Sequence, residues 1–209
     1  MIVSHKHKFI YMKTRKTASS SIQAALTIHC GKDDVIAGSN FSNGAPDDKA
    51  NYTINCGGFG SHPHETIGVV KRGMDRLYPG EWENYFKFTF VRNPWDIVVS
   101  RYHWDKYGKN TSKIGFLDWV KSNKIPAYDR GDIYYAIDGK IALDFIGKYE
   151  NLSEDLKYIE NKLNITLDLP QLKSGYRSSR NYREFYDEQS KDIVANIFKN
   201  DIDNFGYKF

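Results

Sequence analysis

The sequence predicts an α/β fold of three layers, in which helices cover both faces of a central, mainly parallel sheet. Two observations lead to this prediction. A short apolar run, a polar turn and a helical pattern follow one another at residues 9–29, and the same order recurs at residues 85–104. No internal repeat is visible in the 209 residues. Alternating strands and helices are typical of domains with parallel sheets. The length suits a single domain over residues 1–209.

The first predicted pair of elements is a strand at Phe9–Met12 and a helix at Ser20–His29. Phe9–Met12 is a short apolar run of the kind that forms buried strands. Within Ser20–His29, the apolar residues Ile22, Ala25 and Leu26 recur at helical spacing. The polar residues between the two elements therefore form a turn that joins a strand to a helix.

The second predicted pair begins with a strand at Tyr85–Val91, where aromatic residues alternate with others. In the helix that follows, Asn93 suits the N-cap, Pro94 the first helical position and Asp96 the first turn. Two more helices are predicted further along the chain. The first is capped by Ser153 and has an apolar side formed by Leu156, Ile159 and Leu163. The second covers Gln189–Lys199, and its buried side is formed by Ile193, Val194, Ile197 and Phe198.

A long loop is predicted at residues 38–60, where glycine, asparagine, serine, aspartate and proline dominate the sequence. Loops of this length within a compact domain are usually functional or disordered. We therefore expect this segment to be flexible, and contacts to a substrate are expected from loops such as residues 31–60.

The composition excludes several classes of protein. A hydrophobic fraction of 40% with 15% aromatic residues predicts a folded chain. The net charge of +4 suits an anionic ligand, but lysine and arginine are spread along the chain rather than gathered on one helix, so a nucleic-acid partner is not expected. No apolar run of about 18 residues is present, so we expect no membrane span.

The same composition predicts a cytoplasmic protein. The first residues lack the apolar segment of a signal peptide. Cys30 and Cys56 have no metal-ligand spacing and are expected to be reduced thiols. No cluster of aspartate, glutamate and histidine has metal-binding spacing, so no metal is expected.

The turn after the first strand has the residues of a phosphate site. A helix that follows a strand points its free N–H groups and its dipole at an anion in the turn. The cations and hydroxyls available for that anion are those of Arg15, Lys16, Thr17, Ser19, Ser20 and Ser21, with the small Ala18 among them. Both glycines of the ATP-binding signature G-x-x-x-x-G-K-[ST] are missing, which disfavours a Walker-type ATPase. A basic loop before an ordinary serine-capped helix is the alternative.

A second candidate phosphate site lies at the end of the second strand. Arg92 stands at this end and Ser100 lies about two turns into the helix that follows. An arginine fork together with a hydroxyl suits a terminal phosphate. The alternative is that Arg92 pairs with a nearby carboxylate and Ser100 only packs.

Together, the two stretches resemble the nucleotide-binding motifs of sulfotransferases that use 3′-phosphoadenosine-5′-phosphosulfate (PAPS), most of all the carbohydrate sulfotransferase branch. In that family a K-T-x-x-[ST]-[ST] loop binds the 5′-phosphosulfate and an R-N-P-x-D-x-x-V-S-x-Y segment binds the 3′-phosphate. Here they read Lys16-Thr17-Ala18-Ser19-Ser20-Ser21 and Arg92 to Tyr102. In this register Lys16 is the family lysine, and Lys13 is expected to be a residue of the strand end.

The resemblance implies a P-loop-like fold, PAPS as co-substrate, 3′-phosphoadenosine-5′-phosphate (PAP) as product, and a hydroxyl acceptor, with a carbohydrate favoured. It also implies that the basic segment containing Lys173, Arg177 and Arg180 closes over the nucleotide, whereas a solvated basic face is the alternative. The resemblance covers most of the chain except residues 31–60. The first loop departs from the family pattern, because Ala18 and Ser19 stand where glycines are common and restrict φ.

A general base is expected between the two motifs. His62 and His64 lie there, and a neutral imidazole titrates near the operating pH. The resemblance favours His64, followed by His62 and then Glu65. The alternative is a pair of solvated loop histidines, and two ligands alone would make only a weak metal site.

The leading hypothesis from the sequence is therefore a PAPS-dependent sulfotransferase that uses Lys16 at the leaving phosphate. Two other functions stay open at this point. A nucleotide-kinase-like phosphotransferase shares the turn-and-helix arrangement and would need a metal ion and ATP. A non-catalytic module would bind the nucleotide or a glycan without any transfer.

Overall fold

The computed structural model describes residues 1–37, 56–60, 62–108, 113–122, 125–170 and 181–209. The chain divides into two compact units. Unit 1 consists of Met1–Val91 and Ile133–Leu172, and unit 2 of Arg92–Asp132 and Lys173–Phe209. The prediction of a single domain over residues 1–209 stays a prediction. Most of the loop predicted at 38–60 lies outside the described residues, but Phe59 near its end is buried in the core.

Unit 1 is built on a five-stranded sheet with the order β3-β1-β2-β4-β7. These strands are β1 (Ile2–Ser4), β2 (Phe9–Tyr11), β3 (Val35–Ile36), β4 (Phe86–Val91) and β7 (Phe145–Lys148). β4 pairs in parallel with β2 and β7, whereas β1 is antiparallel to β2 and β3. The predicted strands at Phe9–Met12 and Tyr85–Val91 are thus confirmed as the centre of the sheet. β1 and β3 add an antiparallel part that the sequence did not predict.

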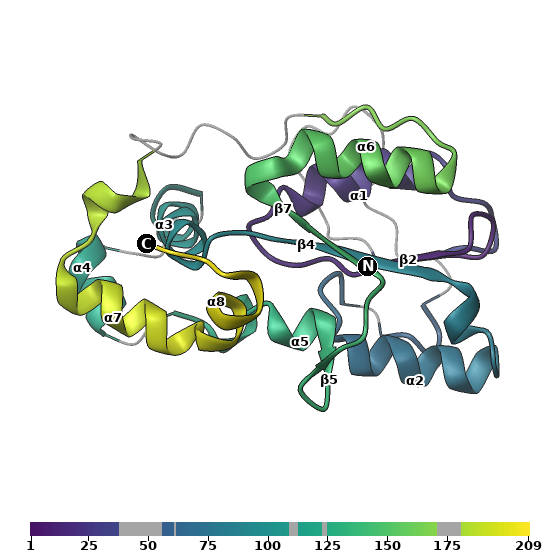
Figure 1. Ribbon diagram of the computed structural model, residues 1–209, viewed down its shortest axis with the longest axis horizontal. Helices are drawn as coiled ribbons and strands as arrows, with labels where there is room; N and C mark the ends of the chain where they lie inside the picture. Colours follow the sequence, from purple (N-terminus) through teal and green to yellow (C-terminus); the bar gives the residue numbers. More distant parts are fainter. Residues whose placement is uncertain (38–55, 61, 109–112, 123–124, 171–180) are drawn as a thin grey trace. The chain divides into compact units, whose positions relative to one another are not determined.

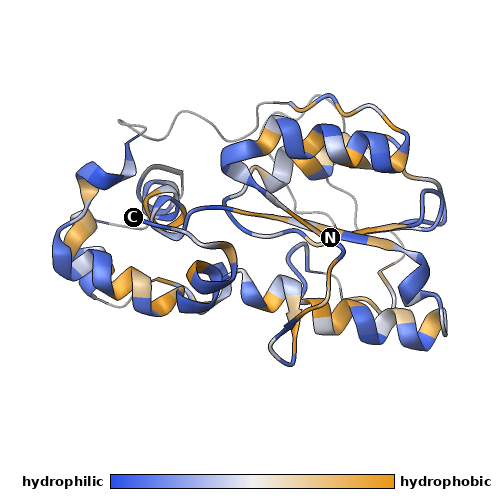
Figure 2. Cartoon of the chain, viewed as in Figure 1, coloured by the Kyte–Doolittle hydropathy of each residue, from blue (hydrophilic) through white to orange (hydrophobic). Residues whose placement is uncertain are grey.

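Helices cover both faces of this sheet (Figure 1). The helices α1 (Ser19–Thr27) and α6 (Leu152–Leu163) lie on one face, and α2 (Ile67–Leu77) lies on the other. Successive residues of a strand point to opposite faces, so Phe9 and Tyr11 pack with α1 and α6, whereas Ile10 packs with α2. Figure 2 shows apolar residues in bands along α2 and α6, separated by polar ones, as expected for helices with one buried side. The predicted three-layer α/β fold is confirmed.

Close packing between β4 and β7 depends on a glycine. A Cβ atom added to Gly147 would lie only 2.5 Å from the Phe90 ring, so no larger residue fits there without a shift of the aromatic side chain. The rest of unit 1 consists of short elements: the end of α5 (Asp132–Tyr135), the hairpin of β5 (Ala136–Ile137) and β6 (Lys140–Ile141), and the 3₁₀ turns Trp82–Asn84 and Tyr149–Asn151.

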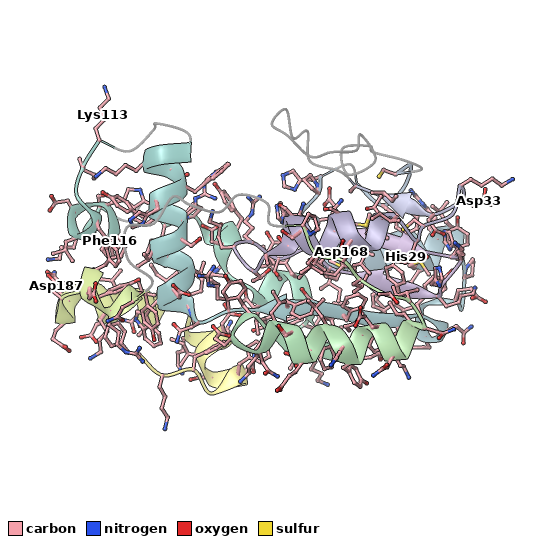
Figure 3. All side chains as sticks on the ribbon, turned by 90° about the horizontal axis from the view of Figure 1, so that it is seen from above. His29, Asp33, Lys113, Phe116, Asp168 and Asp187 are labelled. Atoms are coloured by element: carbon pink, nitrogen blue, oxygen red, sulfur yellow. The ribbon has the colours of Figure 1, made fainter. Side chains whose placement is uncertain are left out.

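Unit 2 is helical. It contains α3 (Pro94–His103), which continues as a π-helical turn at Trp104–Gly108, together with α4 (Phe116–Lys121), α7 (Glu188–Ile197), α8 (Lys199–Phe205) and the 3₁₀ turns Ala127–Asp129 and Tyr182–Phe185. Val98, Trp119 and Val194 belong to its apolar core. Figure 3 labels Phe116 on α4 and Asp187 at the start of α7. Lys121 of α4 forms a 2.7 Å ion pair with Asp187.

The local signals for helix starts were reliable in one case and not in another. Asn93 caps α3, because its Oδ1 accepts a 3.1 Å hydrogen bond from the Trp95 N–H, and Pro94 is the first helical residue as predicted. In contrast, Asn151 is the N-cap of α6, so the prediction that Ser153 caps this helix was wrong. The helix predicted over Gln189–Lys199 ends at Ile197, and a second helix begins at Lys199.

Candidate functional site

The turn between β2 and α1 is fixed to the neighbouring strand β4 by two hydroxyls. Thr89 Oγ1 donates a hydrogen bond to Met12 O at 2.6 Å, and Thr14 Oγ1 donates to Phe90 O at 2.5 Å. Because Thr14 gives its only hydroxyl proton to Phe90, Thr17 donates the 2.8 Å hydrogen bond between the two threonine hydroxyls. The start of the turn is therefore held rigidly at the carboxyl end of the parallel strands.

The backbone of the turn adopts a conformation that L-residues rarely take. Lys16 and Ala18 have φ values of 62° and 58°, whereas Thr17 between them keeps the ordinary negative sign. Left-handed residues in a turn can bring successive N–H groups to one side and so form an anion-binding concavity. Each left-handed residue other than glycine costs about 1–2 kcal/mol. The sequence already indicated that Ala18 restricts φ, and the structure places it in the restricted region.

Helix α1 begins directly after this turn and presents its N-terminus there. Ala18 is the N-cap and supplies no capping side chain, and the first turn carries no acidic residue. Ser19 and Ser21 are buried, whereas Arg15, Lys16 and Ser20 are half-buried. A helix N-terminus without its own carboxylate favours an external anion.

Lys13 and Lys16 occupy different environments in this turn. The side chain of Lys13 is only 1% exposed, two residues beyond the end of β2, as expected for a residue of the strand end. Lys16 is half-buried and lies beside the start of α1. The choice of Lys16 as the residue that reaches a ligand stays a prediction.

His64 packs against the same turn. Its Nδ1 lies 2.8 Å from Lys13 O, and a carbonyl only accepts, so Nδ1 carries the proton and Nε2 keeps a lone pair. Burial, followed by the positive charges of Lys13 and Arg15, lowers the pKa of His64 to about 2. His64 is thus a neutral imidazole with a fixed tautomer. The ring of the buried Tyr134 lies 6.4 Å from it, centroid to centroid.

The other two candidate bases serve the loop itself. His62 is exposed, and its Nδ1 accepts a 3.1 Å hydrogen bond from the His64 N–H. Glu65 Oε1 accepts from the His62 N–H at 2.9 Å, and it would lie 2.3 Å from a Cβ atom on Gly60. Gly60 has a φ of 78°, so this position suits glycine on both grounds. Among the three candidates, His64 is the one whose side chain forms a hydrogen bond with the turn between β2 and α1.

Within unit 2, Arg92 is paired with a carboxylate. Its Nε and Nη2 both donate to Asp96 Oδ2, at 2.8 and 2.6 Å. The pair is largely buried, and Ser100 is half-buried two turns along α3. The carboxylate partner that the sequence left open as an alternative is therefore present. Lys173, Arg177 and Arg180 lie outside the described residues.

Two elements of this arrangement were not predicted from the sequence. Asp96 was assigned only to the helix start, although its spacing of four residues from Arg92 is the spacing of a helical ion pair and could have indicated the contact. The hydrogen bond between His64 and the Lys13 carbonyl joins residues that are 51 positions apart, and no local pattern indicates it. Within the described part of the chain, no three residues of the types histidine, cysteine, aspartate and glutamate are grouped for a metal ion.

The fold and the turn define a three-layer α/β protein with a cationic, amide-lined turn at the carboxyl edge of its sheet. Residues 1–208 match the family model described as the sulfotransferase family, so the chain belongs to this family. The predicted family and the enzyme class drawn from it are thereby confirmed. No described helix is long and apolar enough to cross a membrane.

The chain is also similar to individual proteins. The chain is similar to an uncharacterized protein of Archaeoglobus fulgidus, with 36% identity over 108 residues that make up 49% of this chain and 87% of the relative. The crystal structure of mouse sulfotransferase SULT7A1 complexed with PAP has a similar fold, with a TM-score of 0.54 and 13% identity over 97% of this chain and 86% of the mouse chain. A sulfotransferase from Alicyclobacillus acidocaldarius gives a TM-score of 0.46 and 11% identity, covering 97% and 96% of the two chains.

Replacement of Ala18 by glycine should stabilise the ligand-free protein. Glycine removes the cost of the left-handed conformation, so we expect the free energy of unfolding in urea to rise by about 1 kcal/mol. The matched control is Ala24→Gly in the interior of the same helix, which should lower the stability by about 1 kcal/mol. A destabilising effect of Ala18→Gly would contradict the strain argued for this turn.

The stability of the protein should fall in mild acid. The pKa of His64 is about 2 in the folded state against 6.5 when unfolded, so the unfolded state binds the extra proton below pH 6.5. The contribution of His64 to stability is therefore complete above this pH and decreases as the pH falls below it, by at most about 1.4 kcal/mol per unit. Urea unfolding at pH 7, 6 and 5 measures the slope.

The variant His64→Asn should flatten this slope, whereas His62→Asn at the exposed neighbour should not. Part of the slope should remain in either variant, because burial also lowers the pKa of His5. An unchanged slope in His64→Asn would show that His64 does not remain neutral in the folded protein.

Proposed function

We propose that this protein transfers a sulfuryl group from PAPS to a hydroxyl group of a carbohydrate, with His64 as general base. The observation that carries the proposal is the cationic turn with two left-handed residues at the start of α1, in a chain of the sulfotransferase family. The turn suits an anionic group at the one place where the family resemblance expects the 5′-phosphosulfate.

In this proposal each part of the donor has its own residues. The 5′-phosphosulfate is held by the N–H groups at the start of α1 and by Lys16, Thr17, Ser20 and Ser21. The ammonium of Lys16 neutralises charge on the leaving phosphate. Arg92 and Ser100 hold the 3′-phosphate. The basic segment containing Lys173, Arg177 and Arg180 is proposed to close over the nucleotide. The PAP bound to the mouse sulfotransferase of similar fold supports PAP as the product.

The geometry of His64 supports its role as base. Its Nε2 keeps a lone pair because Nδ1–H is held by the Lys13 carbonyl, and the depressed pKa keeps the ring neutral at physiological pH but also makes it a weak base. Nε2 would take the proton of the acceptor hydroxyl while the new oxygen–sulfur bond forms and the bond to the leaving phosphate breaks. An anionic donor in the turn would offset the charges of Lys13 and Arg15 and so raise the basicity of the imidazole.

The carbohydrate acceptor rests on the branch of the family that the two motifs resemble, and the cytoplasmic location stays a prediction from the sequence. Membership of the sulfotransferase family disfavours the nucleotide-kinase alternative.

Transfer of labelled sulfate from PAPS to a panel of glycans, with and without EDTA, tests the proposal. We expect transfer that EDTA leaves unchanged. Metal-dependent turnover of ATP would favour a kinase, and tight PAP binding without any transfer would favour a binding module.

Replacement of Lys16 by methionine should lower the transfer rate at least about a hundredfold, because the charge that stabilises the leaving phosphate is lost. Lys13→Met removes a cation of the same type from a buried position in the same turn and should have a smaller effect on kcat. Both variants are compared with the wild type in melting temperature. Equal losses of kcat would show that the register of the turn was chosen wrongly.

Replacement of His64 by glutamine should lower kcat about 10²–10⁴-fold and leave the Kd for PAP nearly unchanged, because proton transfer is lost and donor binding is not. His62→Gln is the control, since this side chain is exposed. Turnover of His64→Gln close to that of the wild type, with PAP still bound, would exclude His64 as the base.

A further inference from the structure

We propose that a cleft along α2 binds an acidic group of the acceptor glycan, a carboxylate or a sulfate, through Arg72 and Arg76. This inference rests on the proposed function, in which the acceptor is a carbohydrate, and it assigns a specificity site for that acceptor. The cleft has a volume of about 520 Å³ and is lined by Gly58, Val69, Arg72, Asp75 and Arg76.

The helix that lines the cleft begins beside the candidate base. α2 starts at Ile67, three residues after His64, and Val69 lies in its first turn. A helix rises about 1.5 Å per residue, so Arg72 and Arg76 stand about 7.5 and 13.5 Å along the axis from Ile67. An acceptor whose reacting hydroxyl lies at the base can therefore extend along α2 to the two arginines.

One wall of the cleft belongs to the segment 56–60, which is packed tightly against α2. Phe59 is only 1% exposed and belongs to the core of unit 1. A Cβ atom on Gly73 would lie 2.6 Å from the Phe59 ring and 2.8 Å from Gly58 O, so this close approach needs a glycine in the helix. The wall is thus fixed, and it is the described end of the loop 31–60, from which contacts to a substrate are expected.

The two guanidinium groups lie over glycine positions. Arg76 Nη2 would be 2.3 Å from a Cβ atom on Gly58, where φ is 100°, and Arg72 Nη1 would be 3.6 Å from one on Gly68. Arg72 therefore extends back over the first turn of α2, towards the end of the helix that follows the candidate base.

The charges of these two arginines are not balanced by ion pairs within the described part of the chain. Neither Arg72 nor Arg76 forms a hydrogen bond or an ion pair with a described residue. Like charges four residues apart on a helix repel each other, and an anion between them removes this repulsion. The last turn of α2 favours a cation at Arg76 in any case, but Arg72 lies in the middle of the helix, where the dipole gives no such preference.

The acidic residue of the lining does not cancel this positive charge. Asp75 Oδ2 lies 2.7 Å from Lys71 Nζ, four residues earlier on the same helix. This pair is neutral, so Arg72 and Arg76 leave the cleft positive. An arginine fork binds an oxyanion through two parallel N–H···O bonds. The phosphosulfate of the donor is assigned to the turn before α1, so the anion of this cleft is assigned to the acceptor.

The test measures the affinities for charged and neutral probes by calorimetry in the presence of PAP. The first probe is a hexasaccharide of alternating glucuronic acid and N-acetylglucosamine. The second is the same hexasaccharide with its carboxylates reduced to alcohols, and the third is this reduced form after chemical sulfation. Comparison of the first and third probes distinguishes a carboxylate from a sulfate as the bound group.

We expect the wild type to bind at least one charged probe about tenfold more tightly than the neutral one, because the charge-assisted hydrogen bonds are lost with the anion. Arg72→Gln and Arg76→Gln should each lower this preference about threefold, and the double variant should nearly abolish it. Asp75→Asn should raise the affinity for the charged probe about twofold, since a negative charge leaves the lining.

Lys157→Gln is the matched control. This lysine is exposed on α6, on the other face of the sheet (Figure 1), and its replacement lowers the net charge by the same amount. It should keep the wild-type preference. Arg72 and Arg76 are exposed side chains, so their variants should fold, and melting temperatures check this.

Equal affinities of the wild type for charged and neutral probes would overturn the inference, and so would an unchanged preference in the double variant. Weaker PAP binding in the arginine variants would assign the cleft to the donor and overturn it as well. The proposed function fails separately. A wild type that prefers the charged probes but transfers no sulfate to any glycan would contradict the proposed function, whereas the preference itself would still support an acid-binding cleft.

Discussion

The parallel pairing of β2 with β4 is the constraint on which the candidate site depends. Their register places Tyr11 opposite Phe88, so both strands end at the same edge of the sheet. The hydroxyls of Thr14 and Thr89 can therefore cross between the two strands just beyond their paired residues. These bonds fix the start of the turn between β2 and α1. The turn determines where α1 begins and which carbonyl accepts the hydrogen bond from His64.

The charges gathered at this turn favour an anion. Three cations, Lys13, Arg15 and Lys16, follow one another within four residues, and the first turn of α1 adds no carboxylate. Cations this close repel one another in a partly buried place, and burial together with their charge keeps His64 unprotonated. An anion bound in the turn would reduce the repulsion and also make His64 more basic. Donor binding and base strength would thus be coupled through the same electrostatic field.

Local signals predicted the parts of the fold that local residues determine. The start of α3 follows from Asn93 and Pro94, and the central strands follow from their apolar runs. In contrast, β1 and β3 exist through antiparallel pairing with β2 and with each other, which their local sequences do not specify. The tautomer of His64 likewise depends on a carbonyl that is brought close only by the fold, so the sequence could suggest a base but not distinguish His64 from His62 on physical grounds.

The absence of glycine from the turn has a physical consequence for binding. A glycine-bearing turn reaches left-handed φ values freely. Here Lys16 and Ala18 have left-handed φ values, and the hydrogen bonds of Thr14 and Thr17 hold the turn in place. The conformational cost is met during folding, so less remains at the moment of binding. A turn of this kind lowers the stability of the folded protein but provides a preorganised anion site. A glycine at position 16 would adopt the same φ value but would lack the ammonium group of Lys16.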